Sequence, residues 1–231
     1  MKAMILAAGR GERMRPLTDR LPKPLLAVGG KPLIVWHIEA LARSGVREIV
    51  INHAWLGSTL EEALGDGSRW GASITWSREG EDGLETAGGI ATALPLLGDA
   101  PFLVVNGDVF TDFDLARLVT HARELDAQRC QAHLVLVPYP GHKAGAALAL
   151  DTTGRVSVAN GAPYTFSGLA AYHPAFFAGV PAGQKKPLLP LFDAHGASGL
   201  VRGEVLSGEW TDVGTPERLT ELDARLQAMM R

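Results

Sequence analysis

The segment from Gly9 to Thr18 combines residue types that suit a polyphosphate. It reads GRGERMRPLT and follows the apolar run Met1–Ala8 directly. Glycines let backbone N–H groups approach oxyanions closely, and fixed cations neutralise their charge. Lys23 follows between Pro22 and Pro24, and these two prolines restrict the backbone and so fix where the lysine begins. Together these residues predict a site for the phosphates of a nucleotide.

The loop departs from two common glycine-rich motifs. A Walker A motif requires a lysine and a hydroxyl directly after the glycines, and this loop lacks them. The dinucleotide fingerprint GxGxxG requires a third glycine, but here Arg13-Met14 follows Gly9-Arg10-Gly11. An ordinary turn with surface arginines therefore explains the loop equally well until Lys23 is considered.

Two aspartates could hold a metal ion beside those phosphates. Asp108 follows a buried apolar strand and a glycine, and Asp212 stands in the segment WTDVGT. Each aspartate alone is explained by an Asx turn or a helix cap. Because Mg²⁺ prefers one or two carboxylates together with substrate phosphates, the two aspartates and the phosphate loop predict a Mg²⁺ site.

The elements that must position these residues alternate through the first half of the chain. Alternating strands and helices with short connections imply a parallel sheet covered on both faces. Ser58 is expected to cap the second helix, and Gly98 to end the third. The expected strands are Ala3–Ala8, Glu48–Asn52, Ala72–Trp76 and Phe102–Asn106, and the expected helices are Leu33–Arg43, Ser58–Leu64, Ala87–Leu97 and Leu115–Leu125.

The polar segments of this half follow its predicted strands. Open α/β sheets bind ligands at the carboxyl ends of their strands. We therefore expect four segments to meet at one edge of the sheet: Gly9–Arg15, Asn52-His53, Glu79–Gly89 and Asn106–Asp108.

The pattern changes after about residue 131, where strands follow one another without helices between them. This indicates a small antiparallel or mixed extension beside the first sheet. Thr215 is expected to cap the last helix, with Pro216 in its first turn. The expected strands are His133–Val137, Ala146–Leu150, Arg155–Val158 and Phe166–Tyr172, and the expected helices are Leu188–Ala194 and Thr215–Met229.

Composition excludes several classes of protein. The 231 residues carry a net charge of −3, so no general basic field favours nucleic acid. A single cysteine, Cys130, excludes an internal disulfide framework and a cysteine-based zinc site. No apolar run approaches the roughly 20 residues that span a bilayer, and the N-terminus lacks the layout of a signal peptide. We expect one compact cytoplasmic domain over residues 1–231 that binds no nucleic acid or membrane.

The motifs resemble those of the sugar-1-phosphate nucleotidyltransferases. Five of them fall in the order typical of that family: LAAGRGERMRPLT at Leu6–Thr18, PKPL at Pro22–Leu25, ETAGG at Glu85–Gly89, NGD at Asn106–Asp108, and WTDVGTPE at Trp210–Glu217. Within the family, the segment Asn52–Gly57 and the short C-terminus most resemble the N-acetylmuramate 1-phosphate uridylyltransferases of bacterial cell-wall recycling. The resemblance implies a Rossmann-like, mixed and mainly parallel sheet flanked by helices. Residues 1–130 would form the nucleotide-binding half, and residues 131–231 would form the sugar-binding half.

The resemblance also implies roles for individual residues. Catalytic roles would fall to Arg13, Lys23 and Asp108, and Mg²⁺ would be held by Asp108 and Asp212. The nucleotide would be bound by Leu6, Ala8, Gly9, Gly11, Glu12, Arg13, Lys23, Glu79, Glu85, Gly88 and Asn106. The sugar phosphate would be bound by Asn106, Gly145, Asn160, Ser167, Lys186 and Trp210.

The implied reaction transfers a nucleotidyl group from a nucleoside triphosphate, UTP by preference, to a sugar 1-phosphate, with release of pyrophosphate. N-acetylmuramate 1-phosphate is the favoured acceptor, and Lys185, Lys186 and Arg202 are candidate partners for its lactyl group. Many family members have an acidic residue and Lys-Pro near residue 160, where this chain reads ANGAP, so this segment does not indicate the sugar.

Other functions agree with the same motifs. Mannose-1-phosphate guanylyltransferase, glucose-1-phosphate thymidylyl- or uridylyltransferase and choline-phosphate cytidylyltransferase use related chemistry. A nucleotide-binding regulatory subunit without turnover is the alternative from a different class. The expected partners are the two substrates, and the expected state is a monomer or a small homo-oligomer.

Overall fold

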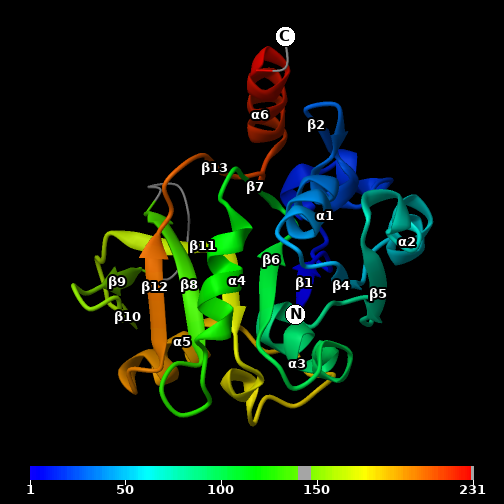
Figure 1. Cartoon of the computed structure of the whole chain (residues 1–231). Coiled ribbons are helices and arrows are strands. Elements are labelled where there is room, and N and C mark those ends of the chain that lie inside the picture. The colour runs from blue at the N-terminus through cyan, green and yellow to red at the C-terminus, as the bar shows by residue number, and fades with distance from the viewer. Residues whose placement is uncertain (140–146, 230–231) are drawn as a thin grey trace.

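The computed structural model describes residues 1–139 and 147–229. Within these ranges a nine-stranded sheet forms the centre of the molecule, with helices packed on both of its faces (Figure 1). No helix in the described ranges has both the length and the apolar character that crossing a membrane requires.

The first half of the chain builds the parallel part of the sheet. Strand β1 (Lys2–Leu6) lies between β4 (Glu48–His53) and β6 (Phe102–Asn106), and β5 (Ser73–Arg78) pairs with the outer edge of β4. All these pairings are parallel, so the carboxyl ends of the four strands lie at the same edge of the sheet. The expected order of strands and helices in this half is confirmed.

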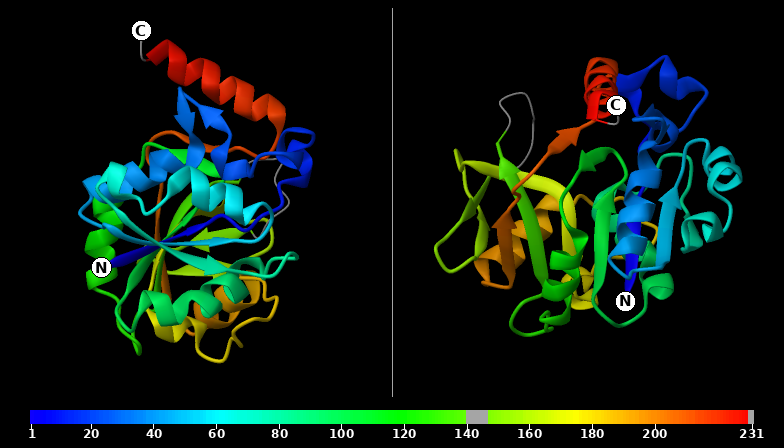
Figure 2. Two further views of the ribbon diagram at one scale, coloured as in Figure 1. Left: turned by 90° about the vertical axis from the view of Figure 1, so that its right-hand side faces the viewer. Right: turned by 45° about the horizontal axis from the view of Figure 1, so that its top comes forward.

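Alternate residues of these strands pack against helices on opposite faces, as strands buried on both sides require. Helix α3 (Glu85–Leu97) covers one face, where Ile90 and Leu97 pack with Met4. The other face packs against α1 (Leu33–Arg43), α2 (Gly57–Leu64) and α4 (Leu115–Arg123) (Figure 2).

The second half continues the same sheet instead of lying beside it. Strand β11 (Tyr164–Tyr172) pairs antiparallel with β6 on one edge and with β8 (Ala132–Pro138) on the other. This half also contains β9 (Leu148–Leu150), β10 (Val156–Val158), β12 (Val201–Val205), which is parallel to β8, and α5 (Leu189–Ala197). The expected strand Ala146–Leu150 begins outside the described residues.

Two small ribbons stand above the carboxyl edge. Strand β7 (Val109–Thr111) pairs with β13 (Trp210–Asp212), and β2 (Ala27–Val28) pairs with β3 (Lys31–Pro32). Helix α6 (Pro216–Met229) rises beside the β2–β3 ribbon (Figure 2). Leu222 and Leu226 of this helix are buried together with Val28.

The helix termini agree with the sequence at some positions and differ at another. Helix α1 has exactly the expected bounds, and Gly98 follows α3 as expected. Thr215 accepts the N–H of Arg218 at 3.5 Å, in the manner of an N-cap. Ser58 is not a cap, because α2 begins one residue earlier, where Gly57 lies directly against the ring of His53.

Candidate active site

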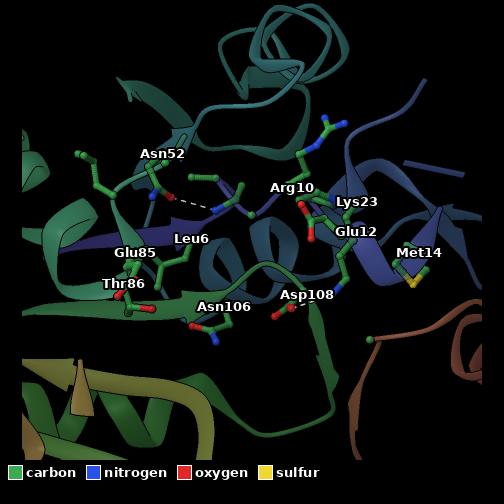
Figure 3. Close-up of a pocket in the computed structure, with 18 of the residues that line it drawn as sticks. Leu6, Arg10, Glu12, Met14, Lys23, Asn52, Glu85, Thr86, Asn106 and Asp108 are labelled. Carbon is green, nitrogen blue, oxygen red and sulfur yellow. Dashed lines mark hydrogen bonds and ion pairs between the residues drawn. The ribbon is translucent and has the colours of Figure 1, made fainter. Parts of the chain in front are cut away.

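A cavity of about 630 Å³ opens at the carboxyl ends of β1, β4 and β6 (Figure 3). The four polar segments expected at this edge do meet around it. The expected site residues that line the cavity are Leu6, Ala8, Gly9, Gly11, Glu12, Arg13, Lys23, Glu85, Asn106 and Asp108. Segments that lie more than 100 positions apart in the sequence, such as those of Leu6 and Asp108, therefore form one wall.

The glycine-rich loop closes on itself. Gly11 has a φ of +69°, a conformation that side chains other than glycine rarely adopt, and its carbonyl accepts the hydroxyl of Thr18 at 2.8 Å. Buried Met14 anchors the short 3₁₀ turn Glu12–Met14 in a small apolar core, while Arg13 in the same turn is exposed. The loop thus holds its backbone in place and leaves Arg13 at the cavity.

Arg10 also lines the cavity, and its guanidinium is held by an aromatic ring. The Arg10 Cζ lies 3.5 Å from the ring centroid of Trp55, and Trp55 Nε1 donates to the Thr18 carbonyl at 3.1 Å. Arg10 Nη1 is buried and has no hydrogen-bond partner among the described residues. Arg10 belongs to the predicted phosphate loop, but no residue pattern indicates its contact with Trp55, which joins loops 45 positions apart.

Lys23 and Asp108 form an ion pair within the cavity. Lys23 Nζ lies 2.7 Å from Asp108 Oδ2, and the pair joins the turn Lys23–Leu25 to the end of β6 (Figure 3). The lysine side chain is 8% exposed and that of the aspartate 40%. Gly107 permits this arrangement, because a Cβ there would lie 2.8 Å from the carbonyl oxygen of Leu6.

Asp212 is brought to Asp108 through the backbone. It lies opposite Val109 in the β7–β13 ribbon, and the next N–H, that of Val213, donates to the Asp108 carbonyl at 3.0 Å. The Asp212 carboxylate itself pairs with Arg218 Nη1 at 3.2 Å and lines an adjoining hollow of about 410 Å³.

Arg13 and Asp212 meet at Gly214, which lines the central cavity. A Cβ on Gly214 would lie 3.1 Å from Asp212 Oδ1 and 3.2 Å from Arg13 Nη2. The exposed arginine of the loop and the second aspartate therefore flank the same point of the wall.

Glu79 supports the cavity from behind. Its Oε1 accepts Asn52 Nδ2 at 2.6 Å, and its Oε2 accepts the Leu84 N–H at 2.7 Å. Asn52 lines the cavity and accepts the N–H of Ala7 at 2.9 Å through Oδ1. Burial raises the pKa of Glu79 from its ordinary value. Glu79, expected at the nucleotide, thus ties the loop before α3 to β1 and β4 and does not line the cavity.

Gly88 and Gly89 allow two close contacts in the first turn of α3. A Cβ on Gly88 would overlap the carbonyl oxygen of Gln184, and one on Gly89 would lie 2.6 Å from Glu79 Oε1. The Lys186 carbonyl accepts the N–H groups of Ala87 and Gly88 at 3.0 and 3.1 Å. Gly88 therefore packs against the 184–186 segment instead of facing the cavity.

Glu85 begins α3 at the cavity wall with a φ of +57°. This left-handed conformation is costly for a residue other than glycine, and such strain concentrates at functional sites. Thr86, which belongs to the expected segment Glu79–Gly89 but was given no role of its own, lies beside it on the wall (Figure 3).

The residues expected at the sugar phosphate are more dispersed. Ser167 is fully buried, and its Oγ accepts the Leu169 N–H at 3.1 Å, so its hydroxyl faces the protein interior. Trp210 Nε1 donates to the Ser167 carbonyl at 2.8 Å, and its side chain lines the hollow beside Asp212. Asn160 lies in an exposed turn after β10, and Gly145 lies outside the described residues.

The candidate lactyl partners also differ in position. Lys185 and Lys186 are exposed on the segment that contacts the start of α3. Arg202 instead lines a separate hollow with Cys130 and His121, so it does not face the central cavity.

Comparison with known proteins agrees with this arrangement. The model of the nucleotidyl transferase family matches residues 2–157. The chain is 53% identical over 226 residues to the N-acetylmuramate alpha-1-phosphate uridylyltransferase of Neisseria meningitidis serogroup B, with 97% of both chains covered. It is 34% identical over 234 residues to the protein of the same name from Caulobacter vibrioides, with 97% of this chain and 96% of the relative covered.

A solved structure shows the same fold. The glucose-1-phosphate thymidylyltransferase homologue of Bacillus anthracis superimposes with a TM-score of 0.87 at 21% identity, over 98% of this chain and 95% of that one. The family match, the full-length relatives and the cavity at the carboxyl edge agree, and this chain belongs to the nucleotidyl transferase family.

Proposed function

We propose that this enzyme transfers the uridylyl group of UTP to N-acetylmuramate 1-phosphate in peptidoglycan recycling. The products are UDP-N-acetylmuramate and pyrophosphate. The observation that carries this choice of substrates is the 53% identity, over 97% of both chains, to a relative with that name. The nucleotide half of the site is supported by the glycine-rich loop, Arg13 and Lys23 at one cavity.

In this mechanism a phosphate oxygen of the sugar 1-phosphate attacks the α-phosphorus of UTP. One oxygen–phosphorus bond forms while the bond to the bridging oxygen of the β-phosphate breaks, and pyrophosphate leaves with that electron pair. The attacking phosphate is already anionic, so the reaction needs no general base. The main obstacle is repulsion between two polyanions, which positioned cations reduce.

We assign different parts of the two substrates to different residues of the cavity. Backbone N–H groups of the Gly9–Gly11 loop bind the triphosphate, and Arg10, Arg13 and Lys23 neutralise it. The backbone of residues 84–86, which Glu79 braces, contacts the base. Asn106 lies at the end of β6 beside Asp108, where the two substrates would meet.

Asp108 and Asp212 would hold Mg²⁺, and their chemistry fits this ion. Both offer carboxylate oxygens, and their backbones are joined by the Val213–Asp108 hydrogen bond. Asp108 pairs with Lys23 and Asp212 pairs with Arg218, so each carboxylate already attracts a cation. When bound, Mg²⁺ would stabilise negative charge on the transferring phosphoryl group.

The broader organisation follows from the same proposal. Residues 1–130 would serve the nucleotide and residues 131–231 the sugar, within one domain. We propose that the enzyme is cytoplasmic, because nucleoside triphosphates are cytoplasmic metabolites and Cys130 is a free thiol. We also propose that it is a monomer or a small homo-oligomer.

A substrate panel tests the proposal. The purified enzyme is incubated with Mg²⁺, each of the four nucleoside triphosphates or dTTP, and the 1-phosphates of N-acetylmuramate, glucose and mannose. Pyrophosphate release and mass spectrometry of the nucleotide sugar are the readouts. We expect UTP with N-acetylmuramate 1-phosphate to give the highest kcat/KM. A higher value for GTP with mannose 1-phosphate would contradict the proposal, and so would UTP binding without pyrophosphate release from any acceptor.

A further inference from the structure

A second group of metal-binding side chains lies apart from the cavity described above. His121 of α4, His133 of β8 and Glu204 of β12 offer ligand atoms that all lie within 4.8 Å of one another. They stand where α4 packs against the sheet, beside a hollow of about 260 Å³ that His121 and His133 line. Figure 1 shows these three elements side by side, and β8 pairs directly with β12.

Two of the three separations are close to those between ligands on a tetrahedral ion. The Nε2 atoms of His121 and His133 each lie 3.5 Å from Oε1 of Glu204. With zinc–nitrogen and zinc–oxygen bonds of about 2.0–2.1 Å, tetrahedral ligand atoms stand about 3.3–3.4 Å apart. The same separation is long for a hydrogen bond between imidazole and carboxylate.

Two of these atoms are buried and make no hydrogen bond in the described part of the chain. His133 Nε2 and Glu204 Oε1 have no hydrogen-bond partner among the described residues, and the His133 side chain is only 9% exposed. Buried polar atoms are costly when unpaired, so a native protein normally provides them with a partner. Here the two atoms face each other at the distance that an ion between them would require.

Neighbouring groups orient the ligands. Arg117 pairs with Oε2 of Glu204, which leaves Oε1 toward the histidines. Glu124 Oε2 lies 3.8 Å from His121 Nδ1, so its negative charge is near the ring nitrogen that would not bind the ion.

We propose that His121, His133 and Glu204 form a binding site for a divalent transition metal ion, Zn²⁺ by preference. Two imidazoles and one carboxylate are ligands that Zn²⁺ accepts, and a fourth position opens on the hollow. The two rings are stacked 3.7 Å apart, so His121 turns out of the stack to aim its Nε2 at the ion, and its one-third exposure permits this turn. The ion joins α4 to β8 and β12 and stabilises the fold without taking part in nucleotidyl transfer.

Metal titration of the full, tag-free chain tests the site. Zn²⁺ is added to chelator-treated protein in millimolar Mg²⁺, which is present to compete for the proposed site at Asp108 and Asp212. Binding is followed by calorimetry and by the spectrum of Co²⁺ in place of Zn²⁺. We expect one ion per chain and a tetrahedral Co²⁺ spectrum. A hundredfold excess of Zn²⁺ over Kd should raise the Tm by about 5–10 °C.

Variants distinguish this site from adventitious binding. His121→Ala and Glu204→Gln should each weaken Zn²⁺ binding at least about 10-fold. His173→Asn is the matched control, because His173 lies outside the group and asparagine keeps its capping role. His121 is on a partly exposed helix face, so its variant remains folded. Absence of Zn²⁺ binding in the wild type, or equal binding by His121→Ala and the wild type, would overturn the proposal.

Discussion

The Nζ atom of Lys23 lies 2.7 Å from Oδ2 of Asp108, although 85 positions separate the two residues. The lysine side chain is buried at the cavity wall, and the aspartate is the more exposed partner. Removing either residue leaves the charge of the other without this partner in a partly buried place, which is costly. A substitution at either residue should therefore affect the charge of the site as well as the contact itself.

Replacing either member of this pair should abolish most of the activity. We expect Lys23→Ala and Asp108→Ala each to lower kcat/KM about a hundredfold or more, because one preorganised charge contact contributes about 3 kcal/mol to transition-state stabilisation. Steady-state pyrophosphate release is the measurement. Lys31→Ala is the control, since Lys31 forms an ion pair with Glu39 outside the cavity, and it should retain normal turnover. Folded Lys23→Ala and Asp108→Ala with near-normal turnover would show that the pair is not catalytic.

The contact between Arg10 and Trp55 should govern binding of the nucleotide. Trp55→Leu removes the aromatic face, so we expect it to raise the KM for the nucleotide about 5- to 10-fold, because cation–π contacts contribute about 1 kcal/mol. Arg10→Ala should show at least the same increase. Trp55→Phe keeps a ring and loses only the bond to Thr18, so its KM should lie between those of the wild type and Trp55→Leu. An unchanged KM in Arg10→Ala would exclude contact between this arginine and the nucleotide.

An added methyl group at Gly88 should disturb both halves of the chain. Alanine favours helix over glycine by up to about 1 kcal/mol, yet a Cβ at this position overlaps the backbone oxygen of Gln184. We expect Gly88→Ala to lower the free energy of unfolding by about 1–2 kcal/mol and to raise the KM for the nucleotide, as the 84–86 segment shifts. Gly80→Ala serves as the control, because no atom lies within 4 Å of its added Cβ. Equal unfolding midpoints for the two variants would contradict the predicted clash.

His37 should make stability depend on pH. Burial lowers the pKa of His37 from 6.5 to about 4, and its neutral Nε2–H donates to the Val109 carbonyl at 2.7 Å. Between these two pKa values the unfolded chain binds a proton that the folded chain does not. The contribution of His37 to the free energy of unfolding is therefore complete above pH 6.5. About 3 kcal/mol of this contribution is lost as the pH falls to about 4.

Denaturant unfolding at neutral pH and near pH 4.5 measures this effect. We expect the wild type to lose more free energy of unfolding between the two pH values than His37→Gln does, because the variant lacks the titrating group. If both proteins lose the same amount, His37 is not the group responsible.

The sequence was most informative where a local pattern decides the structure. The apolar periodicity of Leu33–Arg43 predicted a helix with exactly the observed bounds, and the alternation of strands and helices predicted the parallel half of the sheet. The four loops of the cavity followed from that topology, because parallel strands end at one edge. These expectations required no knowledge of individual side-chain contacts.

Contacts between distant loops could not be predicted in this way. The contact of Arg10 with Trp55 depends on the packing of two turns, and no residue pattern indicates it. Glu79 was expected at the nucleotide, but its partners Asn52 and Leu84 are decided by how β4 and β5 align. The position of Ser167 likewise depends on the irregular register of β11, which turns its hydroxyl inward.

The pairing of β6 with β11 has a consequence for shortened forms of the chain. Residues 102–105 of β6 are almost completely buried, and one of their two edges is covered only through the ladder to residues 169–172. A chain that stopped near residue 130 would keep the phosphate-binding loop, yet it would present an apolar strand with unsatisfied hydrogen-bonding groups. Such an edge recruits other chains, so the isolated first half would self-associate instead of behaving as a small nucleotide-binding protein.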